Sequence, residues 1–253
     1  MRLGLGAGLD DAGMRVDRGW RPQALGAKLL AFWDAENAVS LSLSGSAVTS
    51  WMDGRNGHVL SQATSGARPV IANSINGRPA IAGDGVDDRL ALEPVPAALL
   101  AAPLEIWLLV NQPAPTSETV ARGLFYVGAT GSSQRIAISR TVSGGVNRLV
   151  ATVGNGGGFG SMTSTADFSG IGVVRLEVGA SLSRLSLNDG GAVTASAVPS
   201  LLNTRVAVLA QNTTAPGSSF SIHQVNAILI TQPLDAMEKD RLMAFMKARG
   251  GIA

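Results

Sequence analysis

The sequence predicts an all-β protein with the architecture of an antiparallel β-sandwich, and three observations support this fold class. Short apolar runs recur between turn residues, without the alternating helical segments that a parallel sheet would need. The chain has 31 glycines and only 15% charged residues, which is typical of many short strands joined by turns. Its 253 residues are enough for one domain with a full hydrophobic core.

The expected strands follow one another closely from residue 29 onward. Polar and apolar residues alternate most clearly in segments 135–138 and 184–187, so one face of these strands should be buried and the other wet. The glycine-rich segment 154–160 predicts a loop, because glycine loses the most conformational entropy on ordering. In chain order, the predicted strands are 29–33, 48–51, 80–82, 89–92, 105–111, 123–128, 134–140, 147–153, 172–178, 184–187, 192–195, 205–210 and 220–230.

The C-terminal segment has a different pattern, with apolar residues at helical spacing. We expect an amphipathic helix over residues 234–249, with Asp235 as its N-cap and Glu238 three residues on, as in a capping box. Two glycines at 250–251 supply the stop. Residues 25–253 are therefore expected to form one domain that includes this helix.

Residues 1–24 are rich in glycine, arginine and aspartate and are expected to form an N-terminal arm outside the sandwich. The arm is either a flexible tail or a docking peptide that becomes ordered against another subunit. For docking, the candidate anchor is Trp20 with Arg18 and Arg21, because aromatic and arginine side chains dominate interface hot spots.

Composition excludes several classes of function. The net charge is +2 and the arginines are scattered, so a nucleic-acid partner is not expected. The absence of cysteine removes disulfides, thiol catalysis and thiolate metal sites. Asp10 and Asp11 interrupt the N-terminal segment before a signal-peptide core develops, and no stretch is long enough for a membrane span, so synthesis in the cytoplasm is expected.

A series of short motifs occurs in a fixed order along the chain. The first motifs are Trp33-Asp34, Trp51-Met52-Asp53, Asn56-Gly57, Arg68-Pro69, Asn76-Gly77-Arg78-Pro79 and Asp84-Gly85-Val86-Asp87-Asp88. They are followed by a strand and turn over residues 184–190, and then by a terminal strand and a helix that end in Gly251-Ile252. Over about residues 28–253, the series resembles the concanavalin A-like, laminin-G-like jelly-roll domains of bacteriophage and gene-transfer-agent structural proteins.

This resemblance implies a non-catalytic virion component, such as a head spike, a tail fibre or a decoration protein, with a lectin-like sandwich for glycans of the host surface. Its expected partners are other virion subunits (capsid, spike or tail proteins), further copies of itself as a homo-oligomer, and a cell-surface polysaccharide. The expected location is the virion particle, assembled in the bacterial cytoplasm and released by lysis. Two alternatives remain open, a purely structural protein that contacts only other subunits and a polysaccharide depolymerase.

Catalytic patterns are missing from the sequence. Glycosidases on this kind of fold place carboxylates at alternate positions of one strand, but neither Glu105 nor Glu177 has a second carboxylate two or four residues on. The two histidines, His58 and His223, are not accompanied by a Gly-x-Ser-x-Gly elbow. We therefore expect His58 to be a surface or packing residue, His223 to lie in the core or at an edge, and the protein not to be an enzyme.

The candidate metal ligands are Asp84, Asp87 and Asp88, because Ca²⁺ prefers several carboxylate and carbonyl oxygens on turns. Asp53 could lie nearby. The alternative is structural, since aspartate also favours turns by bonding the backbone next to it. No other cofactor is expected.

The candidate sugar-binding residues are Tyr126, Phe159 and Asn155. An aromatic side chain has to be exposed to act as a platform for a sugar. Trp33, Trp51 and Trp107 lie in apolar strands and should be core residues, whereas Tyr126 and Phe159 are expected to be more exposed, and Asn155 lies in the glycine-rich segment.

Overall fold

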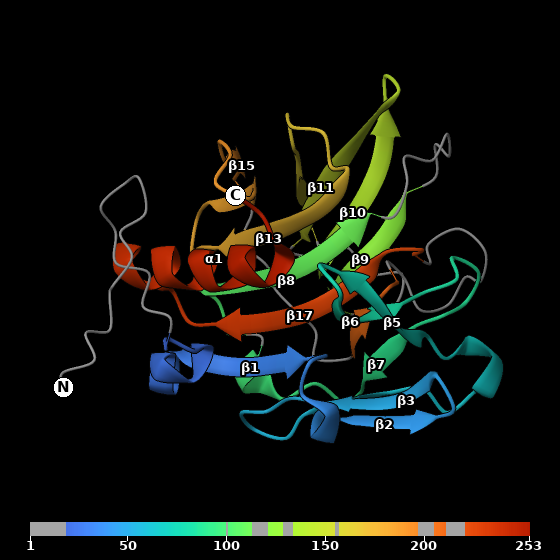
Figure 1. The fold of residues 1–253 in the computed structure, drawn as a ribbon. Helices are drawn as coiled ribbons and strands as arrows, with labels where there is room; N and C mark the ends of the chain where they lie inside the picture. Colours follow the sequence, from blue (N-terminus) through green and yellow to red (C-terminus); the bar gives the residue numbers. More distant parts are fainter. Residues whose placement is uncertain are drawn as a thin grey trace, which may run out of the picture.

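The computed structural model describes residues 19–99, 101–112, 121–128, 134–154, 157–196, 205–210 and 221–253, and within them seventeen strands pair edge to edge. The strands pair in the antiparallel sense and form two layers with the main core between them (Figure 1). The predicted jelly-roll β-sandwich with a C-terminal helix is confirmed.

The first layer is centred on the long strands β8 and β17. Its strands, in spatial order, are β1 (Leu29–Asp34), β17 (Gln224–Thr231), β8 (Leu104–Gln112), β13 (Gly170–Val178), β14 (Ser183–Leu187) and β15 (Val193–Ala195). Strand β17 also pairs with β6 (Arg78–Ala82), which pairs in turn with β5 (Val70–Ile75).

The second layer packs face to face with the first and contains the longest hairpin. Its strands, in spatial order, are β12 (Phe159–Thr163), β11 (Val146–Gly154), β10 (Arg135–Ser143), β9 (Arg122–Gly128), β16 (Arg205–Val208), β7 (Leu90–Leu92), β4 (Val59–Ser61), β3 (Ala47–Met52) and β2 (Leu41–Ser44). One pairing, Ala47 with Val70, joins β3 to β5 and thus links the layers.

The main core takes alternate residues from the strands of both layers. Ile106 and Leu108 of β8 belong to the same buried cluster as Ile136 and Ile138 of β10. The intervening residues of β8 point to the other side of its layer, where they are also buried. A strand buried on both faces explains why residues 106–110 form a continuous apolar run.

Helix α1 (Ala236–Gly250) has the ends that the sequence predicts. The Asp235 carboxylate accepts from the Glu238 N–H, the Glu238 carboxylate accepts from the Asp235 N–H, and both bonds are 2.9 Å long. Gly251 ends the helix in the left-handed conformation, with φ of 65°. Four short 3-10 helices complete the elements: η1 (Pro22–Lys28), η2 (Ala38–Ser40), η3 (Ser65–Ala67) and η4 (Ala97–Leu99).

All the predicted strands are present, and β2, β4, β5 and β12 were not predicted. These four strands expose much of their surface, so they lack the apolar pattern that marks a buried strand. The expected loop over 154–160 is shorter than predicted, because Gly154 ends β11 and Phe159 begins β12. Trp33, Trp51 and Trp107 are fully buried, as expected.

Candidate functional site

The outer face of the first layer is covered by α1 and η1. Trp107 and Leu109 of β8 lie in one buried cluster with Leu242 and Met246 of α1, and Figure 1 shows α1 lying across β8 and β13. A sugar or partner therefore cannot reach this part of the sheet without displacing the helix.

Two carboxylates meet beneath the helix, although the sequence shows no such pair on either strand. Glu105 of β8 is paired directly with Glu177 of β13, and Lys239 of α1 contacts both, at 3.2 Å and 3.1 Å. Glu105 is 2% exposed and also accepts from the backbone N–H of Leu234 and from the indole of Trp107. Burial raises the pKa of Glu105, against the bonds from Leu234 and Lys239. The two carboxylates and Lys239 are enclosed between the sheet and the helix, which is typical of a structural ion-pair cluster. A glycosidase, in contrast, needs space between its two carboxylates for a sugar and a water molecule.

The outer face of the second layer carries a row of residues aligned across five strands. Gly128 of β9 is paired with Arg205 of β16 on one side and with Arg135 of β10 on the other. The register of β10 with β11 places Arg135 opposite Gly154, which is itself paired with Phe159 of β12. Residues directly opposed in antiparallel strands project to the same face, so the three side chains of this row share one surface. We call these five residues the Arg-Phe row.

Phe159 is the exposed end of the Arg-Phe row. Its side chain is 60% exposed, as the sequence analysis expected, and Cζ of Arg135 lies 5.4 Å from the centre of its ring. Arg135 reaches the ring across Gly154, which has no side chain to obstruct it. At the other end of the row, Arg205 forms an ion pair with Glu93.

Tyr126 does not fulfil the expectation of an exposed aromatic. It is 1% exposed and lies in a small cluster with Ala137, Ala207 and Ala210, which flank it on the same face of the second layer. Burial raises the pKa of Tyr126, and the charges of Arg135 and Arg205 oppose this rise. Its hydroxyl group thus lies in the field of two guanidinium groups. Asn155, the third predicted sugar-binding residue, is outside the described residues.

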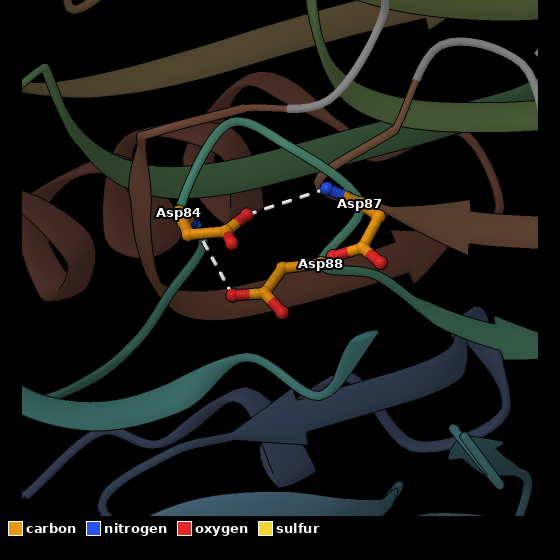
Figure 2. Close-up of side chains that lie close together, drawn as sticks. All are labelled: Asp84, Asp87 and Asp88. Atoms are coloured by element: carbon orange, nitrogen blue, oxygen red, sulfur yellow. Dashed lines mark hydrogen bonds between the residues drawn. The ribbon is translucent and has the colours of Figure 1, made fainter. Parts of the chain in front are cut away.

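The three predicted metal ligands do lie together, with one carboxylate oxygen of each within 4.8 Å of the others (Figure 2). Asp84 is exposed, whereas Asp88 is 5% exposed. Burial, and next the charge of Asp84, raises the pKa of Asp88 to about 6. Asp84 accepts from the N–H groups of Val86 and Asp87, and Asp88 accepts from the N–H of Asp84. These bonds are those of a self-stabilised turn, and calcium binding stays a prediction.

Asp53 takes no part in this cluster. It is buried and accepts from the N–H groups of Arg55, Asn56 and His58, at 2.7, 3.0 and 2.6 Å. His58 is half-buried beside this turn, in keeping with a packing role.

His223 is fully buried, as the sequence analysis expected for a core position. Its ring stacks on Phe168 with 5.6 Å between centroids, and Nδ1 is bonded to the Ser221 hydroxyl. Burial, together with the positive charges of Arg140 and Arg122, lowers the pKa of His223 to about 3. The imidazole is therefore neutral and screened from substrate, which excludes it as an accessible general base.

Two residues of the predicted docking anchor, Trp20 and Arg21, pack against helix α1 of their own chain. Trp20 is half-buried and meets Phe245 of α1 edge to face, with 6.1 Å between centroids. The guanidinium of Arg21 lies 5.9 Å from the centre of the same ring. Arg18 lies outside the described residues, which begin at residue 19. Docking to another subunit stays a prediction.

Comparisons with known proteins place the chain by its fold. No family model and no curated protein matches its sequence. Among solved structures, a Trypanosoma rangeli sialidase in complex with a difluoro-nononic acid derivative has a TM-score of 0.61 at 11% identity, over 88% of this chain and 33% of that one. The likeness is one of fold.

Two further structures support the same conclusion. The binding domain of botulinum neurotoxin serotype C1 has a TM-score of 0.56 at 12% identity, over 87% of this chain and 52% of that one. An arabinofuranosidase complexed with arabinofuranosyl-xylobiose has a TM-score of 0.54 at 12% identity, over 81% and 51%. The chain thus spans a third to a half of each of these three structures.

In the described part of the chain, no helix is long and apolar enough to cross a membrane. One hollow, bordered by Ser164, Ser186 and Gly190, has a volume of only ≈ 30 Å³. That is room for about one water molecule, so this hollow is too small for a sugar.

Arg135 and Arg205 were not predicted from the sequence as candidate site residues. Arg135 begins the alternating segment 135–138, so its outward direction could be read from the sequence. Its contact with Phe159 could not, because that contact depends on the registers of β10 with β11 and of β11 with β12.

Proposed function

We propose that this chain is a non-catalytic, glycan-binding β-sandwich and serves as a virion component, such as a head spike, a tail fibre or a decoration protein. Phe159 is the observation that supports glycan binding. It is the one aromatic among the large apolar side chains that the described residues expose, and it lies on the layer that α1 does not cover. An exposed ring beside polar groups suits the apolar face of a sugar.

A binding function, rather than hydrolysis, is favoured by the surroundings of the acidic residues. Glu105 and Glu177 are held by Lys239 beneath the helix. The fold is compatible with binding, since the matched structures include the binding domain of a botulinum neurotoxin.

The virion role rests on the motifs that resemble phage and gene-transfer-agent proteins. In this proposal, the arm attaches the sandwich to capsid, spike or tail subunits, several copies assemble together, and the particle leaves the bacterial cytoplasm by lysis. The sandwich then faces the host surface.

The test is a glycan array probed with the wild-type protein, Phe159→Ala and Met237→Ala. Met237 is a suitable control because it is an apolar side chain of similar exposure, at 62%, on the other side of the molecule. We expect wild type and Met237→Ala to bind the same glycans and Phe159→Ala to bind at least tenfold more weakly, because a stacked ring is lost. Binding to no glycan would favour the purely structural alternative, and loss of polysaccharide viscosity would favour a depolymerase.

A further inference from the structure

Arg135 holds a positive charge that the described residues do not neutralise. Arg205, its neighbour in the Arg-Phe row, is paired with Glu93, and Arg175 of the first layer is paired with Glu177. No carboxylate of the described residues forms an ion pair with Arg135, and its buried Nε has no hydrogen-bond partner. An arginine that is half-buried without a counter-ion leaves part of its donor capacity unused.

The local backbone holds this guanidinium in place. A Cβ on Gly128 would lie 2.5 Å from the carbonyl oxygen of Gln134 and 3.0 Å from Cα of Arg135, so only glycine permits the close approach of β9 and β10 there. On the other side, Gly154 lets the side chain lie across β11 and contact Phe159. Two glycines therefore leave the space that the Arg135 side chain occupies, and the Phe159 ring contacts its guanidinium group.

We infer that the Arg-Phe row binds an acidic sugar residue, one with a carboxylate on its ring. This inference rests on the proposed glycan-binding function and names the class of glycan. The apolar face of the sugar stacks on the exposed part of the Phe159 ring, and its carboxylate accepts hydrogen bonds from the Arg135 guanidinium. Arginine suits this role because its planar fork of donors matches the two oxygens of a carboxylate. Arg205 adds less attraction, because Glu93 already compensates its charge.

The experiment compares two acidic polysaccharides, polygalacturonate and hyaluronan, with their carboxyl-reduced forms, which keep the sugar backbone and lose the charge. Affinities of the full chain are measured by calorimetry at 50 mM and 300 mM salt. We expect at least one acidic polymer to bind roughly tenfold or more tightly than its reduced form, and to weaken with salt because the contact is electrostatic.

The decisive variant is Arg135→Gln, with Arg184→Gln as its matched control. Arg184 is an exposed arginine on β14 of the first layer. Its neighbour Leu185 points into the main core, so Arg184 points to the outer face of the first layer and its substitution removes the same charge from the opposite side of the sandwich. Arg135→Gln should weaken binding of the acidic polymer roughly ten- to a hundredfold, as expected for a lost charge-assisted hydrogen bond, and Arg184→Gln should not. Phe159→Leu should also weaken it, and Glu93→Gln should strengthen it.

The remaining outcomes would overturn either the acidic-sugar site alone or the glycan-binding function as well. Equal binding of acidic and reduced polymers, or unchanged binding by folded Arg135→Gln, would overturn the acidic-sugar site and leave glycan binding intact. Binding of neutral glycans alone would do the same. Failure to bind any polymer here and any glycan on the array would overturn both proposals. Circular dichroism and thermal melting identify a variant that has failed to fold, and Arg135→Lys then serves as the second test, since it keeps the charge and loses the bidentate geometry.

Discussion

At the scale of single residues, the interior of the sandwich holds a histidine in its uncharged form. His223 is fully buried between Phe168 and Ser221, and the positive charges of Arg140 and Arg122 add to the cost of protonating it. In the unfolded chain, the same imidazole would take a proton at its ordinary pKa of about 6.5. Because the pKa of His223 differs between the folded and the unfolded chain, the free energy of unfolding depends on pH.

We therefore expect His223 to make the protein less stable in acid. Between about pH 6.5 and 3 the unfolded chain binds the extra proton, so the free energy of unfolding falls as the pH falls. From pH 7 to 4 this contribution amounts to roughly 3 kcal/mol. The measurement is urea unfolding of wild type and His223→Gln over this range. The difference in free energy between them should shrink toward acid pH, and a constant difference would contradict the prediction.

Single residues also show where sequence reasoning succeeds. The three core tryptophans and the Asp235 cap were predictable, because apolar strand patterns and capping boxes are local signals. The burial of Tyr126 was not predictable, since it depends on residues from other parts of the chain, among which Ala137 and Ala207 lie beside it on the neighbouring strands. Arg135 was missed for the same reason, because its importance comes from strand register.

At the scale of elements, α1 is fixed to the first layer by charge as well as by apolar packing. Lys239 is the one cation that contacts both Glu105 and Glu177 among the described residues. Without it, two carboxylates would face each other across β8 and β13, one of them almost fully buried. Removal of one partner from a buried ion pair leaves an uncompensated charge, which is much more costly than loss of a surface pair.

We expect Lys239→Met to lower the free energy of unfolding by about 2 to 4 kcal/mol at pH 7. Part of this loss should be recovered at pH 5. The folded-state pKa of Glu105 is already raised by burial and would rise further without the cation, so the folded protein gains a proton before the unfolded chain does. Lys247→Met is the control, because Lys247 lies on the same helix but pairs with an exposed carboxylate, that of Asp189 in the turn between β14 and β15. It should cost less than about 1 kcal/mol, with no recovery in acid. Equal losses for the two variants would contradict a buried clamp.

Elements differ in how well the sequence reveals them. The long strands β8 and β17 are buried on both faces and were predictable as apolar runs. Strand β12 was not predicted, because its five residues, Phe159–Thr163, are mostly exposed, mix apolar with small and polar side chains, and follow a glycine-rich segment. The same strand brings Phe159 to the Arg-Phe row, so a strand that was not predicted supplies the exposed aromatic ring of the candidate site.

At the scale of the whole molecule, the two outer faces of the sandwich have different uses. One face is covered by α1 and η1, and the other carries the Arg-Phe row. Trp20 packs on Phe245, so the chain enters the sandwich on the helix-covered side (Figure 1). An arm that attaches to a particle from that side would leave the Arg-Phe row accessible to a host glycan.

The boundary for removal of the arm follows from these contacts. Trp20 and Leu25 contribute to the packing on α1, so a cut at residue 24 would remove part of this packing, whereas a cut before Gly19 would keep both residues. We expect removal of residues 1–18 to change the free energy of unfolding by less than about 0.5 kcal/mol. In the virion proposal it should also abolish incorporation into particles, measured by co-sedimentation after expression with the particle genes. Phe245→Ala in the full chain is the control, because loss of this half-buried ring of α1, which packs on Trp20, should cost about 1 to 3 kcal/mol and leave the arm and its candidate anchor residues present. Normal incorporation of the shortened chain would refute attachment through residues 1–18.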